Sequence, residues 1–154
     1  EGDNDRVKFL ALLCEEEDEE TALACSGALA ILTSNSAKCC EKMITPSSWL
    51  EILHTLIANP SPDVQFRGIV IIHNMIRQSK TVAEKIFDTD VLQLLMGVTQ
   101  LNDEKRSKAI EEAKLCLKTA EDMKLIQEKK DDANDMMPDV FQQPQNEDLE
   151  EENE

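Results

Sequence analysis

Apolar positions along the chain repeat with a period of 42 residues. A shift of 42 places four sets of apolar residues in register: Val7, Trp49 and Val91; Leu10, Ile52 and Leu94; Ala11, Leu53 and Leu95; and Cys14, Leu56 and Val98. Within each segment they stand at i, i+3, i+4 and i+7, which is the apolar stripe of an amphipathic helix. The pattern therefore predicts one such helix in each of three stacked repeats.

Two further segments repeat with nearly the same period. Residues 39–44 match residues 82–87, including an identical Glu-Lys pair, and residues 28–32 match residues 71–75 and 113–117. Each repeat therefore contains a short, a medium and a long helix. We expect helices at residues 5–15, 18–34, 36–44, 48–58, 62–78, 80–87, 90–100 and 103–123.

Polar residues mark where several of these helices begin. Ser48 with Glu51 three residues later has the pattern of a capping box. Ser61 followed by Pro62 is typical of an N-cap with proline at the first helical position. Short connections between the helices favour antiparallel neighbours.

The repeat length decides between helical repeat classes. Triplets of helices with a period near 42 predict an all-α, right-handed α-solenoid of armadillo-type repeats, whereas a tetratricopeptide repeat has 34 residues. HEAT repeats have a similar period, but the separate short helix favours armadillo repeats. Composition agrees, because aromatic residues are only 3% of the 154 and a core of small aliphatic side chains suits helices better than sheets.

The net charge of −16 is unevenly distributed. Residues 127–154 carry two lysines against eleven acidic residues, while residues 1–126 carry 14 basic and 21 acidic residues. We expect an armadillo domain over 1–126 and a disordered acidic tail over 127–154, because a highly charged segment of low hydrophobicity does not offset its ordering entropy. Both parts would repel phosphate, so we expect neither nucleic acid nor a membrane as a partner.

Residue types that often carry chemistry have structural interpretations in this sequence. The five cysteines fall in apolar-periodic segments, which indicates buried thiols in a reducing cytoplasm, and their spacing does not match a zinc site. His54 and His73 lie on different predicted helices, and the acidic run at residues 15–20 predicts a solvated turn. We therefore expect no enzyme activity, no cofactor and no metal.

The second predicted long helix carries the candidate binding residues. Beside its apolar positions Phe66, Ile69, Ile72 and Ile76, a second face carries Arg67, Asn74, Arg77 and Gln78. One interpretation is an ordinary solvated face. The other is a site for an extended partner chain, because an amide hydrogen-bonds peptide groups and arginine pairs with acidic side chains.

Five motifs occur in order along the predicted ordered stretch: Ser26-Gly27-Ala28-Leu29-Ala30-Ile31-Leu32-Thr33, Trp49-Leu50-Glu51-Ile52-Leu53, Val64-Gln65-Phe66-Arg67-Gly68, Asn74-Met75 and Asp103-Glu104-Lys105-Arg106. In this order they resemble the C-terminal end of the animal UCS-domain myosin chaperones. Together these motifs span about residues 5–126. The tail from residue 127 has no counterpart in the family pattern.

The resemblance implies a non-enzymatic module that holds partly folded myosin motor domains. It also implies that heat-shock protein 90 is recruited only through an N-terminal tetratricopeptide domain, which this sequence does not contain. Two alternatives remain open: a general cytoskeletal or signalling scaffold, and a nuclear-import adaptor. The adaptor is disfavoured because such proteins use repeated Trp and Asn on their long helices, and this sequence has one Trp.

Overall fold

A computed structural model describes the backbone of residues 2–135 and the side chains of residues 6–124. Over this range the chain forms α1 (Gly2–Leu13), α2 (Glu19–Asn35), α3 (Ala37–Met43), α4 (Trp49–Ile57), α5 (Pro62–Gln78), α6 (Lys80–Phe87), α7 (Val91–Thr99), a 3₁₀ turn η1 (Glu104–Arg106) and α8 (Ser107–Asp135). All eight predicted helices are present in the predicted order. The all-α class predicted from the sequence is confirmed.

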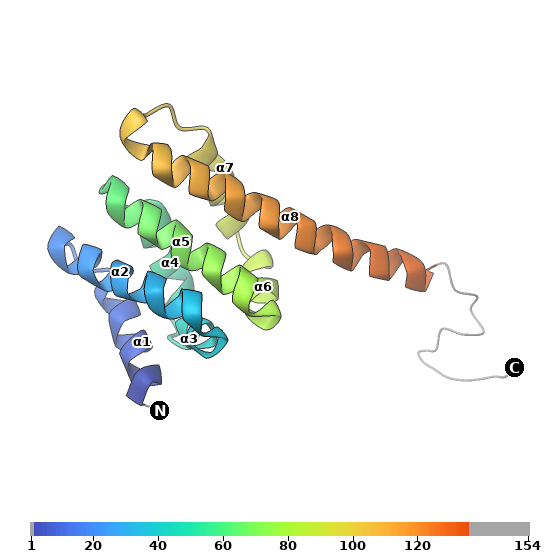
Figure 1. The fold of residues 1–154 in the computed structure, drawn as a ribbon, viewed down its shortest axis with the longest axis horizontal. Helices are drawn as coiled ribbons and strands as arrows, with labels where there is room; N and C mark the ends of the chain where they lie inside the picture. Colours follow the sequence, from blue (N-terminus) through green and yellow to red (C-terminus); the bar gives the residue numbers. More distant parts are fainter. Residues whose placement is uncertain (1, 136–154) are drawn as a thin grey trace, which may run out of the picture. The chain divides into compact units, whose positions relative to one another are not determined.

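The long helices α2 and α5 lie side by side, with the medium helix α4 packed behind α5 (Figure 1). The short helices α3 and α6 each follow a long helix and turn the chain back toward the next medium helix. The helices α1, α4 and α7 are thus the medium helices of successive repeats, and α2, α5 and α8 are the long ones. This is the short-medium-long order that the sequence predicts.

The repeat register determines which apolar side chains form the core. Ala11, Leu53 and Leu95 are all buried, and so are the residues of the Cys14 register. The first two registers are less uniform. Val7, Val91 and Ile52 are buried, whereas Trp49 and Leu10 are half-buried and Leu94 is 37% exposed. Phe66 is also half-buried, so it is not part of the fully buried stripe that the sequence predicted for α5.

One glycine permits close packing of two helices within a repeat. A Cβ atom placed on Gly68 would lie 2.6 Å from the Cβ of Leu56, which is closer than two such carbons approach. Any larger residue at this position would therefore push α5 away from α4. Gly68, the last residue of the Val64–Gly68 motif, is therefore needed for close packing of α5 against α4.

The predicted helix starts are partly confirmed. Ser61 caps α5, because its Oγ accepts a hydrogen bond from the amide of Val64, and Pro62 is the first helical residue. The predicted capping box at Ser48 is wrong, since its side chain makes no capping bond to α4. The Ser48 backbone has φ −93° and ψ 17°, outside the extended conformation that aims a capping side chain at the first turn.

The last helix is longer than the sequence predicts. We expected it to end at residue 123, but α8 continues to Asp135 and includes residues 127–135 of the predicted acidic tail. This stretch has neither Gly nor Pro, and Pro138 is the first strong helix breaker. The remaining tail, 136–154, lies outside the described residues. The described residues up to Ala120 form one compact unit, and those from Glu121 to Asp135 belong to a second.

Candidate functional site

Three of the four candidate binding residues connect α5 to α2. Arg67 donates from Nη1 to the carbonyl of Leu23 at 2.6 Å, and Gln78 donates from Nε2 to the carbonyl of Ser34 at 2.7 Å. Between them, Asn74 donates from Nδ2 to the carbonyl of Ala30 at 3.0 Å. Each acceptor precedes its donor by 44 residues. We call these three bonds the α2–α5 ladder.

Asn74 is the central member of this ladder and is completely buried, with 0% of its surface exposed. Its Nδ2 also donates to Thr33 Oγ1 at 3.1 Å, and its Oδ1 accepts from Arg77 Nη2. The expectation that Asn74 hydrogen-bonds a partner chain therefore does not fit its surroundings, because both ends of its amide are occupied inside the protein. Its neighbour one turn along, Arg77, is exposed.

Gly27 makes room for the first member of the ladder. A Cβ atom at Gly27 would stand 3.2 Å from Arg67 Nη1, so the guanidinium lies directly over the backbone of α2. This explains why a glycine and an arginine 40 positions apart both occur in the motifs singled out from the sequence. The pair is a helix-packing device, and it leaves Arg67 half-buried.

The accessible strip of α5 lies beside the ladder. It consists of Asp63, Phe66, Val70 and Arg77, whose spacings of 3, 4 and 7 place them on one face of the helix. Asp63 and Arg77 are exposed, and Phe66 and Val70 are half-buried. This strip combines an apolar centre with a charge near each end, a combination that suits contact with a polypeptide.

His73 connects α5 to α8 and is only 8% exposed. Its Nδ1 lies 2.8 Å from Glu112 Oε2, and its Nε2 lies 2.8 Å from Thr119 Oγ1. The sequence did not reveal this cluster, because its members are 39 and 46 residues apart and belong to different repeats. Its order of carboxylate, imidazole and hydroxyl resembles a hydrolase triad.

A structural role explains the His73 cluster better than catalysis does. The Thr119 hydroxyl also lies 3.1 Å from the carbonyl of Leu115, in the same helix, which gives its single proton a local acceptor. Neither of the pockets described below is lined by these residues. The other histidine, His54, lies 2.7 Å from Asp90 Oδ1 and links α4 to the start of α7.

Arg106 lies in η1, immediately before α8, and makes polar contacts with the preceding repeat. Its Nη1 donates to Gln65 Oε1 at 2.7 Å and to the carbonyl of Asn59 at 3.3 Å, while its Nη2 donates to the carbonyl of Pro60 at 2.9 Å. Its Nε also lies 3.5 Å from Asp103. The guanidinium thereby fixes the turn between α4 and α5 onto η1.

The five cysteines are buried, as the sequence predicted. Burial raises the pKa of the Cys14, Cys40 and Cys116 thiols to about 12. A thiol with such a pKa carries almost no thiolate at neutral pH, so these cysteines are poor nucleophiles. Among the described residues there is no cluster of three or more His, Cys, Asp or Glu side chains that could hold a metal ion.

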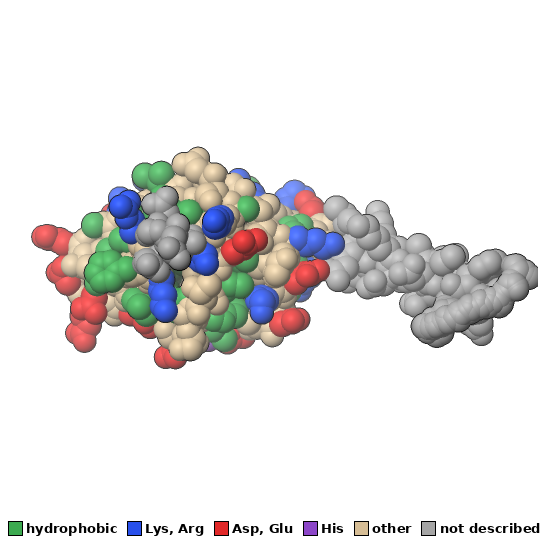
Figure 2. Space-filling view, turned by 90° about the horizontal axis from the view of Figure 1, so that it is seen from below, with side chains coloured by type: hydrophobic (Ala, Val, Ile, Leu, Met, Phe, Trp, Pro, Cys, Tyr) green, Lys and Arg blue, Asp and Glu red, His purple; other side chains and the backbone are tan. Residues whose placement is uncertain are grey.

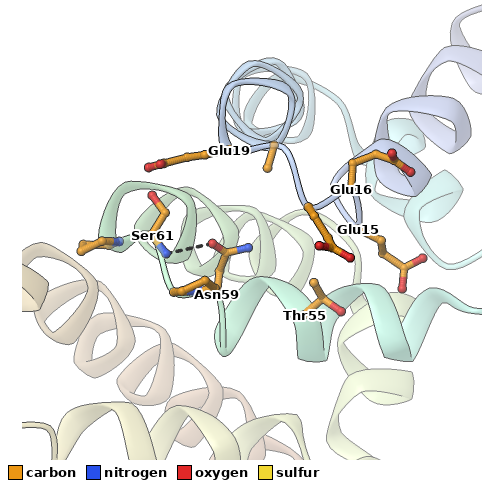
Figure 3. Close-up of a pocket in the computed structure, with 10 residues that line it drawn as sticks. Glu15, Glu16, Glu19, Thr55, Asn59 and Ser61 are labelled. Carbon is orange, nitrogen blue, oxygen red and sulfur yellow. Dashed lines mark hydrogen bonds between the residues drawn. The ribbon is translucent and has the colours of Figure 1, made fainter.

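A pocket of about 630 Å³ lies between the α1–α2 turn and the α4–α5 turn (Figure 3). Glu15, Glu16 and Glu19 surround it from one side and Thr55 and Asn59 from the other. The acidic run is fully exposed, as expected of a solvated turn, and Asp18 begins α2. Hydrogen bonds from the Thr21 hydroxyl and amide lower the pKa of Asp18.

A second, shallower pocket of about 400 Å³ is more apolar. Its lining includes Leu94, Val98 and Leu101, with Gln65 and Arg106 at its polar side. Figure 2 shows a face of the molecule on which basic, acidic and apolar side chains are interspersed. No helix in residues 2–135 has the length and apolarity that crossing a membrane requires.

Comparison with known proteins connects this arrangement to one group. The chain is 40% identical to protein unc-45 homolog B of Danio rerio over 128 residues, and 46% identical to its Xenopus laevis counterpart over 103 residues. The solved structure of UNC-45 from Drosophila melanogaster matches with a TM-score of 0.75 and 64% identity over 79% of the chain. The chain is homologous to a part of the UNC-45 proteins.

This homology confirms the family resemblance found in the sequence and the armadillo-type architecture. The chain spans only 14% of the Danio rerio relative and 15% of the Drosophila UNC-45 chain, so it corresponds to one segment of a much longer protein. No profile of a known protein family matches it.

Proposed function

We propose that this chain is part of the client-holding surface of a myosin chaperone, with no enzymatic role. The observation that carries the proposal is the match to UNC-45 at 64% identity over 79% of the chain, together with the UCS-type motifs of the sequence. In a solenoid, the long helices stand side by side and present a continuous surface to a partner. Here those helices are α2, α5 and α8.

The four candidate residues divide between two roles under this proposal. Arg77 and Gln78 are exposed and contact the myosin motor domain, with Phe66 and Val70 as apolar neighbours. Arg67 and Asn74 each donate a hydrogen bond to a carbonyl of α2, so they affect partner binding only indirectly. The first pair supplies contacts, whereas the second determines the spacing of the helices that present them.

Binding of a purified myosin motor domain tests the contact role. Arg77→Ala combined with Val70→Ser should weaken binding by about tenfold or more, because charged and apolar contacts at one site are lost together. A matched control is Lys85→Ala on α6 combined with Met96→Ser on α7, which removes an exposed charge and an exposed apolar side chain outside the long helices. Undiminished binding by the first variant would remove this strip from the site.

The identity of the partner that binds distinguishes between the alternative functions. Preferential binding of a basic peptide over the motor domain would favour an import adaptor, and binding of neither would favour a general scaffold. We place the protein in the cytoplasm on the strength of the same family resemblance. Recruitment of heat-shock protein 90 is assigned to a tetratricopeptide domain of a longer protein, so the 154-residue chain should not bind that chaperone.

A further inference from the structure

The first half of α8, residues 107–120, is attached to the protein differently from the long helix α5. Its fully buried residues are all small: Ala109, Ala113, Cys116 and Ala120. By contrast, α5 completely buries Ile69, Ile72 and Ile76. Of the larger apolar side chains in this segment, Leu115 is 54% exposed, and Ile110 and Leu117 are half-buried.

This difference has an energetic consequence. Stabilisation by burial increases with the apolar area removed from water, and a methyl group contributes much less area than an isoleucine or leucine side chain. The fully buried stripe of α8 therefore contributes less apolar burial than the isoleucines of α5 contribute to the core. Polar contacts add to the attachment of α8.

Two polar anchors provide those contacts. The first is His73, which bonds Glu112 and Thr119 at 2.8 Å each, and the second is Arg106 at the start of the helix. Both anchors attach to α5 or to the turn that precedes it. Because all of these groups are polar, water can replace each bond once the helix has moved away.

A helix held by small side chains and water-replaceable bonds opens at a lower free energy than the core unfolds. We propose that residues 107–120 form a latch that separates from α5 while α1 to α7 stay folded, and that the His73–Glu112 link governs how often it opens. The proposal goes beyond the proposed function, because it concerns the conformational freedom of the last repeat whatever partner binds.

The chain contains a reporter for this opening. Cys116 lies on the buried stripe of α8 with 0% of its surface exposed, so a thiol reagent reaches it only after the latch opens. Cys40 on α3 is also 0% exposed, and its thiol hydrogen-bonds the carbonyl of Thr33, in the part that stays closed. For both thiols burial raises the pKa to about 12, which makes their closed states comparably inert.

Alkylation of the native 154-residue chain by iodoacetamide, followed by mass spectrometry of each cysteine peptide, tests the latch. Glu112→Ala should raise the alkylation rate at Cys116 by about tenfold or more, as expected from losing a partly buried bond to a charged group, with Cys40 unchanged. The matched control is Glu111→Ala, the same change one residue earlier, where the carboxylate is 71% exposed and pairs with Lys114. This control should leave both rates at the wild-type value.

A second variant separates opening from an electrostatic effect on the thiol. His73→Ala removes the anchor but keeps the Glu112 charge near Cys116, and it should raise the Cys116 rate as well. The proposal is overturned if Cys116 and Cys40 accelerate together, if neither anchor variant accelerates Cys116, or if Glu111→Ala has the same effect as Glu112→Ala. In the unsubstituted chain the Cys116 rate should depend less steeply on urea than the Cys40 rate, and equal dependence would also overturn it.

Discussion

Asn74 donates a hydrogen bond from its side-chain amide to the carbonyl of Ala30, 3.0 Å away and 44 residues earlier in the chain. The same offset joins Arg67 to Leu23. A side chain reaches a particular carbonyl of a neighbouring helix in only one stagger of the two helices. The constant offset therefore fixes how α5 lies along α2.

The loss of stability on substituting a ladder residue should be larger where that residue is more deeply buried. Asn74→Ala should lower the free energy of unfolding by ~1–3 kcal/mol, because it removes the two hydrogen bonds that the buried amide donates to the hydroxyl of Thr33 and the carbonyl of Ala30. Gln78→Ala breaks a bond of the same kind at an exposed position and should cost less than about 1 kcal/mol. Urea unfolding monitored by circular dichroism measures both, and equal losses would contradict this assignment.

Two of the helical glycines, Gly68 and Gly97, should respond in opposite directions to the same substitution. Gly68→Ala places a methyl group against Leu56 and should destabilise the protein by ~1–3 kcal/mol, as overpacking does. Gly97→Ala adds a methyl group where no heavy atom lies within 4 Å, and it should stabilise α7 by up to about 1 kcal/mol. Thermal and urea unfolding of both variants would measure these changes in stability. Destabilisation by Gly97→Ala would contradict the conclusion that a methyl group fits at this position without a clash.

The serines before α4 and α5 differ in their capping role. Ser61→Ala should lower the free energy of unfolding by about 1 kcal/mol, because the amide of Val64 loses its side-chain acceptor. Ser48→Ala should have a smaller effect, since Ser48 makes no capping bond. The two variants can be compared in one series of urea melts. A larger loss for Ser48→Ala would indicate that the capping box exists after all.

Stability should fall in alkaline solution because of the buried thiols. Burial raises the pKa of Cys14, Cys40 and Cys116 from 9.0 to about 12. Between these values the unfolded chain has released the thiol protons while the folded chain keeps them, so the free energy of unfolding decreases as pH rises from 9 toward 12. Each thiol contributes a slope of up to about 1.4 kcal/mol per pH unit, and none below pH 9.

Urea melts between pH 8 and pH 10.5 under reducing conditions would measure this slope. Cys116→Ala should make the slope shallower by the contribution of one thiol, whatever its effect on stability at neutral pH. As a control, Leu115→Ala, which removes an exposed side chain that does not ionise from the same helix, should leave the slope over this range unchanged. An identical slope in the Cys116→Ala variant would contradict the assignment.

The sequence by itself determined the number and order of the helices, because their signals are local. The period-42 register of Ala11, Leu53 and Leu95 identified side chains that are buried in all three repeats. Ser61 and Pro62 located the start of α5 at the correct residue. The end of α8 was misplaced because the charge-rich residues 127–135 favour a helix as well as disorder.

Only the tertiary structure decided what the polar side chains of α5 do. Asn74 and His73 are adjacent in sequence, yet one binds α2 and the other α8. A helical pattern distinguishes a polar face from an apolar one, but it does not say whether water or a neighbouring helix covers the polar face. That outcome depends on the stagger between helices about 44 residues apart, which is set by the packing of whole repeats and not by any one segment.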